Sequence, residues 1–131
     1  MKTYWDSSAL IEALHDPKLR IQIKPGEHAT RPHSLTEVFS TLTKGVNFRY
    51  TALDASNMLQ DLAKDLAFVV LDSGDTMEAI QDASAQGVCG ARIHDLMHAT
   101  AAKKYGADVL LTLDTAGFST LKLPMKVSTP Y

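Results

Sequence analysis

Apolar residues recur at the spacing of an amphipathic helix in four stretches of the chain. In one of them Leu35, Val38 and Leu42 fall on the same face, which predicts a helix that buries one side. A fifth helix is expected between Asp75 and Gly87, where a C-terminal glycine belongs. The predicted helices cover residues 7–14, 34–44, 54–66, 75–86 and 95–105.

Short apolar or β-favouring runs separate these helices. The expected strands cover residues 3–5, 28–30, 68–71, 109–113 and 126–128. The runs 68–71 and 109–113 are continuously apolar, which is typical of strands buried on both faces, and 126–128 is expected at an edge. Strands alternating with helices predict crossover units, and therefore an α/β fold with a parallel sheet covered on both faces. No repeat or linker divides the chain, so we expect one domain over residues 1–131.

The composition is that of an ordinary globular protein, with 45% apolar and 21% charged residues. The single cysteine, Cys89, cannot form an internal disulfide, which suits a reducing compartment. No apolar run approaches the ~18 residues of a membrane span, and no cationic stretch followed by an apolar run opens the chain. We therefore expect a cytoplasmic protein without membrane association.

Four acidic residues stand where a predicted strand ends or a predicted helix begins. Asp6 and Asp114 follow strands, whereas Glu37 and Asp95 stand near helix starts. Ligands of parallel α/β sheets bind outside the carboxyl ends of the strands, so we expect these side chains to gather at one edge. Clustered carboxylates repel one another and favour a hard divalent cation, Mg²⁺ or Mn²⁺. Such a site favours phosphoryl chemistry, in which the ion activates water and neutralises developing charge.

Each of these acids also has a purely structural explanation. The segment Ser34–Glu37 matches a capping box, in which the glutamate reaches back to the N-cap amide. Asp6 and Asp95 suit N-caps or first turns of helices, and Asp114 suits the start of a turn. Asp72 also follows an apolar run, and we interpret it as a helix-start residue. Spacing alone therefore leaves both explanations open.

The net charge of −2 does not by itself indicate a nucleic-acid-binding protein. If four of the fifteen Asp and Glu residues hold metal, eleven remain against thirteen Lys and Arg. Binding of a nucleic acid would then depend on local patches and on the ion. Arg92 is the best basic candidate for such a contact because it lies three residues before Asp95. Other candidates are Lys44, Arg49, Lys103 and Lys104.

Four short motifs follow one another along the chain. The opening Tyr4–Ile11 combines a strand with an Asp-Ser step, and Ser34–Phe39 contains the second acid. Gly90–Ala102 and Gly106–Asp114 contain the third and the fourth. In this order and at this separation they resemble the acidic motifs of the PIN domain family, and within it the VapC-type toxins of toxin–antitoxin pairs. The resemblance covers nearly the whole chain, and Trp5 departs from it, since a smaller apolar residue is common there.

The resemblance implies a three-layer α/β/α sandwich with a central, mostly parallel five-stranded sheet. It implies a Mg²⁺- or Mn²⁺-dependent endoribonuclease, and Ser7 and Thr112 match the family's supporting hydroxyls. Asp6 and Asp95 are our first choice for direct metal ligands. The acids carried over by position as catalytic and metal-binding residues are Asp6, Glu37, Asp95 and Asp114.

The resemblance also implies partners. RNA would be the substrate, with Arg92 as the expected contact, and a toxin would have a cognate antitoxin protein. Apolar surface in the first half of the chain would receive that antitoxin and a second copy of the chain in a homodimer.

Three other functions stay open. PIN domains also serve as RNA-processing nucleases outside toxin systems. A non-catalytic α/β binding module would use the same acids as helix caps. A zinc hydrolase built on His94 and His98 would place two imidazoles on one helix face, but Asp95 stands where the zinc motif has glutamate, and no histidine follows His98 as a third ligand.

Overall fold

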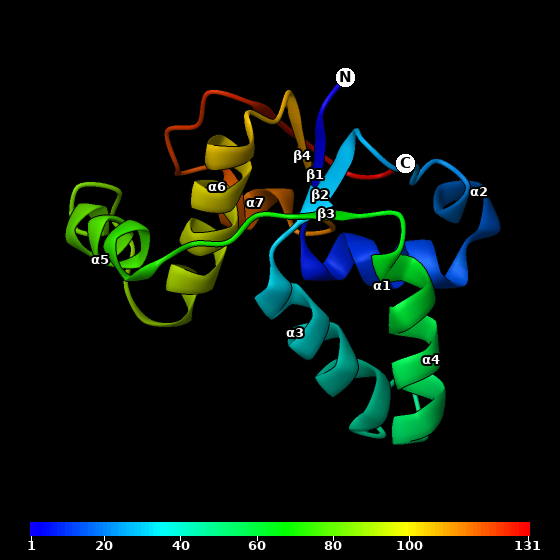
Figure 1. Cartoon of the computed structure of the whole chain (residues 1–131). Helices are drawn as coiled ribbons and strands as arrows, with labels where there is room; N and C mark the ends of the chain where they lie inside the picture. The colour runs from blue at the N-terminus through cyan, green and yellow to red at the C-terminus, as the bar shows by residue number, and fades with distance from the viewer.

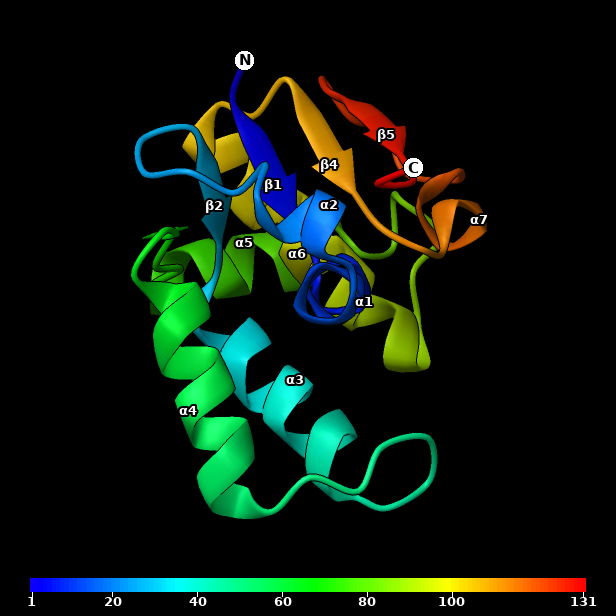
Figure 2. The same cartoon turned by 90° about the vertical axis from the view of Figure 1, so that its right-hand side faces the viewer.

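A single five-stranded sheet organises the chain, and the computed structural model describes all of residues 1–131. The strands are β1 (Thr3–Trp5), β2 (His28–Thr30), β3 (Ala67–Phe68), β4 (Val109–Leu111) and β5 (Lys126–Ser128). All neighbours are parallel, and the order across the sheet is β3-β2-β1-β4-β5. Figure 2 shows β2, β1, β4 and β5 side by side, with their arrows pointing the same way. The predicted parallel α/β sheet is confirmed.

Helices connect the strands on both sides of the sheet. They are α1 (Ser7–His15), α2 (Pro17–Arg20), α3 (Pro32–Thr43), α4 (Ala52–Ala63), α5 (Ser73–Asp82), the 3₁₀ helix η1 (Gly90–Arg92), α6 (Ile93–Tyr105) and α7 (Thr115–Phe118). The five predicted helices are present with displaced ends, whereas the pattern does not indicate α2 and α7. None of the helices combines the length and apolar character needed to cross a membrane.

The sheet separates two hydrophobic cores. Side chains of successive strand residues point to opposite faces, so in β1 Tyr4 enters one core and Trp5 the other. Both side chains are completely buried. The core around Tyr4 includes residues of α6 and α7, and the core around Trp5 includes residues of α1, α3 and α4. Figure 1 shows these two groups of helices on either side of the strands, which is the predicted three-layer arrangement.

The prediction that residues 68–71 form a strand buried on both faces is wrong. β3 contains only two residues and lies at the edge, where β2 is its one neighbour. The amide of Val69 still donates to the carbonyl of Thr30 (2.8 Å), but the chain then leaves the sheet, and Val70 is 62% exposed. A short apolar run looks the same in an edge strand as in a central one, so the pattern cannot distinguish the two.

The capping box predicted over Ser34–Glu37 is also wrong. α3 begins earlier, at Pro32, whose fixed φ suits the first helical position, and its N-cap makes no side-chain bond. Ser34 instead lies buried in the first turn, where its hydroxyl accepts a hydrogen bond from Thr30 Oγ1 (2.8 Å). The glutamate of this segment therefore has no capping role.

The interpretation of Asp72 as a helix-start residue is confirmed. Its carboxylate accepts from the Asp75 amide (2.8 Å), and the Asp75 carboxylate accepts from the Asp72 amide (3.1 Å), a complete capping box for α5. α5 ends at Asp82, four residues before the predicted end. Asp95 stands in the first turn of α6 rather than at its N-cap.

Candidate active site at the carboxyl edge of the sheet

The four predicted site residues lie around the edge where the strands end, which we call the acidic edge. Asp6 directly follows β1, and its amide continues the ladder by donating to the carbonyl of Leu111 (3.0 Å). Asp114 lies three residues beyond the end of β4. Glu37 and Asp95 reach the same edge from α3 and α6.

Asp6 is both a helix cap and a member of the acidic edge. It is 6% exposed, and its Oδ1 accepts hydrogen bonds from the Ala9 amide (2.9 Å) and from Ser8 Oγ (2.7 Å). The predicted N-cap role is therefore confirmed. Both bonds fall on one oxygen, which leaves Oδ2 with acceptor capacity for a water or a cation.

Asp95 and Asp114 converge on Gly117, which the sequence analysis did not identify. Asp114 caps α7 by accepting from the Gly117 amide at Oδ1 (3.0 Å). A Cβ at Gly117 would lie 2.8 Å from Asp114 Oδ2 and 3.0 Å from Asp95 Oδ2. Only glycine therefore lets both carboxylates occupy these places without displacement.

Arg92, expected as an RNA contact, is engaged within the fold. Its guanidinium donates to the carbonyls of Gly87 (3.3 Å) and Gly117 (3.4 Å) and contacts Thr120 Oγ1. These bonds hold the turn that follows Asp114. Its positive charge also lowers the pKa of Asp95, although other influences on that carboxyl are larger.

The negative charges of neighbouring carboxylates act on Asp95. Burial is the largest cause that raises the pKa of its carboxyl above the usual range, and the charge of Asp114 follows. Asp6 raises this pKa further, while His98 and Arg92 lower it. Asp6, Asp95 and Asp114 therefore form one electrostatically coupled group.

Glu37 lies beside two imidazoles. Its Oε1 is 3.2 Å from His98 Nε2 and 3.9 Å from His33 Nε2. Burial alone raises the pKa of Glu37, but His98, Ser7 and His33 together outweigh it and hold the pKa below its usual range. Oε1 is nevertheless buried without a well-aligned hydrogen bond, because the short contact with His98 lacks the required direction.

The supporting hydroxyls act on the acids in different ways. Thr112 is fully buried, and its Oγ1 accepts from the Asp114 amide (3.0 Å). Ser7 Oγ lies 3.5 Å from His98 Nε2, and a contact from this hydroxyl also lowers the pKa of Glu37. Ser8, which the sequence analysis did not single out, bonds to Asp6 and accepts from the Leu113 amide (3.0 Å).

The two histidines of the zinc alternative have different environments. His98 is 4% exposed, with Tyr4 Oη at Nδ1 and Glu37 at Nε2. His94 is exposed, and its ring lies near-parallel to that of His33 at a centroid distance of 6.4 Å. No interaction links His94 with His98, so the structure gives no support to a zinc site built on this pair.

The acidic edge fits a hard divalent cation by the chemistry of its donors, which are all carboxylate oxygens. The unpartnered, buried Oε1 of Glu37 and the crowded charge at Asp95 are both features that a cation would relieve. As the side chains stand, no three Asp, Glu, His or Cys residues of the chain form a ready-made ligand set. Binding of an ion would have to draw the carboxylates together.

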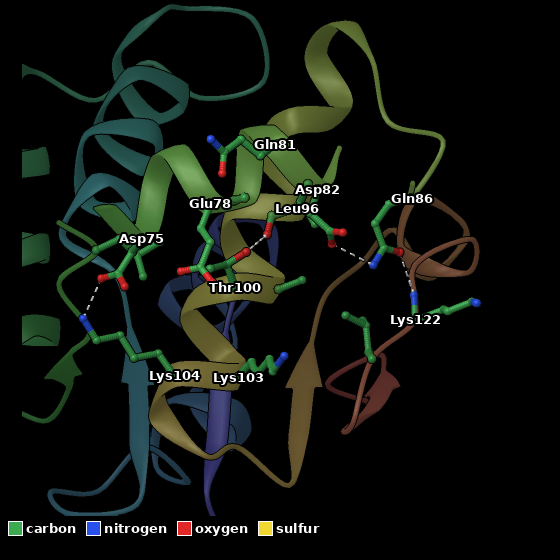
Figure 3. Close-up of a pocket in the computed structure, with 14 residues that line it drawn as sticks. Asp75, Glu78, Gln81, Asp82, Gln86, Leu96, Thr100, Lys103, Lys104 and Lys122 are labelled. Atoms are coloured by element: carbon green, nitrogen blue, oxygen red, sulfur yellow. Dashed lines mark hydrogen bonds and ion pairs between the residues drawn. The ribbon is translucent and has the colours of Figure 1, made fainter. Parts of the chain in front are cut away.

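A separate cavity lies away from the acidic edge. A groove of about 800 Å³ runs between α5 and α6, and none of the four acids lines it. We call it the α5–α6 groove. Figure 3 shows partners for two of its acids: Lys104 Nζ lies 2.7 Å from Asp75 Oδ2, and Gln86 bridges Asp82 to the Lys122 amide. Asp75 is therefore neutralised within the groove, whereas no ion pair neutralises Asp95 at the acidic edge.

Comparison with known proteins agrees with this arrangement. The sequence profile of the PIN domain family matches residues 3–122. Since the match spans nearly the whole chain, the chain belongs to the PIN domain family. No curated protein matches the chain in sequence.

Solved structures show the same fold at low identity. PAE2754 from Pyrobaculum aerophilum is similar with a TM-score of 0.72 and 20% identity, over 96% of this chain and 89% of that one. A chain of VapBC2 from Rickettsia felis, bound to a DNA fragment from their promoter, gives 0.69 and 16%, over 98% of both chains. A chain of VapBC-1 from nontypeable Haemophilus influenzae gives 0.67 and 15%, over 99% of this chain and 98% of that one.

Proposed function

We propose that the chain is a PIN-type nuclease that hydrolyses RNA phosphodiester bonds with the help of Mg²⁺ or Mn²⁺. The observation that carries the proposal is the convergence of the Asp95 and Asp114 carboxylates on Gly117, where burial and the charges of Asp114 and Asp6 raise the pKa of Asp95. A carboxyl perturbed by burial and by specific charged neighbours is typical of functional sites. Family membership over residues 3–122 supports the same conclusion.

The carboxylates of the acidic edge would hold the ion. Asp6 and Asp95 are the first candidates, and Asp114 and Glu37 complete the set. When bound, Mg²⁺ or Mn²⁺ would supply Lewis acidity toward water and toward the phosphodiester. The protein contributes the orientation of its carboxylates: Ser8 fixes one oxygen of Asp6, and Thr112 fixes the backbone of Asp114.

Cleavage of RNA by the purified chain tests the proposal. The assay compares Mg²⁺, Mn²⁺ and EDTA, and it includes Asp95→Asn beside Glu78→Gln, a matched acid-to-amide change in the α5–α6 groove. We expect cleavage that requires the ion, is lost in Asp95→Asn and is retained in Glu78→Gln.

A binding module is the second candidate, because Asp6 and Asp114 do cap α1 and α7. Calorimetric titration with Mn²⁺ distinguishes the two functions. A capping set should bind the ion no better in the wild-type chain than in Asp95→Asn. Absence of cleavage together with equal, weak binding by both would favour the binding module.

We further propose that the nuclease is the toxin of a toxin–antitoxin pair and forms a homodimer. The two VapBC structures of the same fold support the pairing. Ile21, Val46 and Leu53, in the first half of the chain, are 72%, 72% and 70% exposed, which supports apolar contacts there.

Growth and co-purification test the toxin role. Expression of the wild-type chain should arrest growth, and a small protein encoded directly upstream should rescue growth and co-purify with the chain. Sedimentation of the isolated chain should show a dimer. Growth without arrest, together with cleavage of a defined RNA precursor, would instead favour a role in RNA processing.

A further inference from the structure

His98 lies between Tyr4 and Glu37 in a row of polar side chains, and the proposed chemistry gives His98 no role. Its Nδ1 is 2.8 Å from Tyr4 Oη, and the two rings meet edge to face at a centroid distance of 5.8 Å. Tyr4 is completely buried and His98 is 4% exposed. The contact links β1, the central strand, with α6, which carries Asp95.

Hydrogen-bond chemistry selects one tautomer of this imidazole. A neutral histidine donates from one nitrogen and accepts at the other, whereas an ionised carboxylate only accepts. Nε2 lies 3.2 Å from Glu37 Oε1, which only accepts, and 3.5 Å from Ser7 Oγ, which can accept, so the favoured arrangement has the proton on Nε2. Nδ1 then accepts from the Tyr4 hydroxyl, which is the donor that fixes this tautomer.

The environment of Glu37, the last member of this row, explains why position 98 is a histidine. Its Oε1 is removed from solvent and has no aligned donor, and the side chain as a whole is 31% exposed. An apolar residue at position 98 would remove the nearest polar neighbour of this buried oxygen, which is unfavourable for a charged group. The Nε2 proton stabilises the charge of the carboxylate by its proximity to Oε1.

We infer that Tyr4 and His98 are positioning residues for Glu37: the Tyr4 hydroxyl sets the His98 tautomer, and the electrostatic contact between the Nε2–H of His98 and Oε1, at 3.2 Å, restrains the Glu37 carboxylate. This inference rests on the proposed function, in which Glu37 serves the ion site. Outer partners of metal-binding side chains act in the same way, and their loss lowers metal affinity or activity by about 10–100-fold.

Nitrogen NMR of the metal-free chain tests the tautomer without any RNA. In mildly alkaline buffer, the His98 ring of the wild-type chain should carry its proton on Nε2. Tyr4→Phe removes only the hydroxyl, and we expect a mixture of tautomers in that variant. A proton on Nδ1 in the wild-type chain, or an unchanged ring signal in Tyr4→Phe, would overturn the inference.

Mn²⁺ calorimetry and RNA kinetics test the consequence at Glu37. We expect His98→Leu to weaken Mn²⁺ binding and lower kcat by about 10–100-fold with KM for RNA unchanged. His98→Gln, which keeps a donor, should recover part of both. In a Glu37→Gln background the His98→Leu change should have no further effect on either quantity. An equal further loss in that background would show that His98 acts only on folding and would contradict the positioning role.

These measurements separate the two proposals. A wild-type chain that never cleaves RNA would overturn the proposed nuclease. The tautomer and the coupling between residues 37 and 98 in Mn²⁺ affinity are measured without RNA, so they decide the positioning role in either case.

Discussion

The acidic edge and the α5–α6 groove both contain several carboxylates, but the pKa of one carboxyl is raised at the edge and that of another is lowered in the groove. In the groove, the hydrogen bond from Lys104 is the largest cause that holds the pKa of Asp75 below its usual range. At the acidic edge, burial and Asp114 raise the pKa of Asp95. The groove has a volume of about 800 Å³, and its Asp75 is already paired with Lys104. Unsatisfied charge, rather than cavity size, therefore marks the candidate active site.

Neutralising one acid in each region should give the largest contrast. Asp95→Asn should reduce RNA cleavage to the metal-free background, because a coupled carboxylate is lost. The same variant should melt at a higher temperature than the wild-type chain in EDTA, since repulsion by Asp114 and Asp6 disappears. Glu78→Gln in the groove should change neither quantity. A lower melting temperature for Asp95→Asn would argue against crowded charge.

Two glycines that face carboxylates sharpen the comparison. A Cβ at Gly117 would approach Asp114 and Asp95 within 3.0 Å, so Gly117→Ala should lower kcat by about 10–100-fold by displacing them. A Cβ at Gly74 would lie 3.2 Å from Asp72 Oδ1 in the groove region, and Gly74→Ala should leave kcat unchanged. Steady-state RNA cleavage by the two variants checks this. Equal effects would mean that Gly117 is not part of the site.

Acid dependence of unfolding should differ in sign between the two regions. The raised pKa of Asp95 means that its ionisation destabilises the metal-free fold above that pKa, so Asp95→Asn should stabilise the chain at neutral pH. The lowered pKa of Asp75 means that its ionisation stabilises the fold, so Asp75→Asn should destabilise the chain at neutral pH.

Urea unfolding across acidic pH follows the two differences. The stability gained by Asp95→Asn should disappear as the pH falls from the raised pKa to the usual value of 3.8. The stability lost in Asp75→Asn should be recovered only below pH 3.8, as the pH falls through the lowered pKa. Differences of the same sign in the two variants would remove the contrast between the regions.

Breaking the surface pair of the groove should have the smallest effect. Lys104 and Asp75 are partly exposed, and such pairs contribute little because solvent screens them. Lys104→Met should therefore leave RNA cleavage unchanged and lower the melting temperature less than Asp75→Asn does, because Asp75 also accepts from the Asp72 amide. A clear loss of activity would show that the groove takes part in function.

The sequence predicted the parts of the site that depend on neighbouring residues. Asp6 directly follows β1, and Asp114 lies three residues beyond β4, which ends at Leu111 rather than at the predicted residue 113; apolar runs followed by acids reveal such positions. The helix that carries Asp95 was likewise predicted from the sequence, although α6 begins two residues earlier than expected, at Ile93. These features need only local pattern, and the structure confirms the positions along the chain.

Other parts depended on tertiary contacts that no pattern encodes. His98 was visible only as a member of a histidine pair, because its partners Tyr4 and Glu37 are far away in the sequence. Gly117 matters only because two carboxylates meet beside it. The capping box before Glu37 matched by composition, but a proline two residues earlier started the helix first. Local signals therefore located the acids, and packing decided their partners.

The central strand gives the protein a built-in optical probe. Trp5 is the only tryptophan, it is fully buried, and the next residue is Asp6. Its indole N–H donates to His28 Nδ1 (3.0 Å), on the face of the sheet opposite Tyr4. Tryptophan fluorescence of this chain therefore reports from one buried place on the central strand rather than from an average, so a spectral shift on addition of Mn²⁺ would follow cation capture at the adjacent Asp6 without any label.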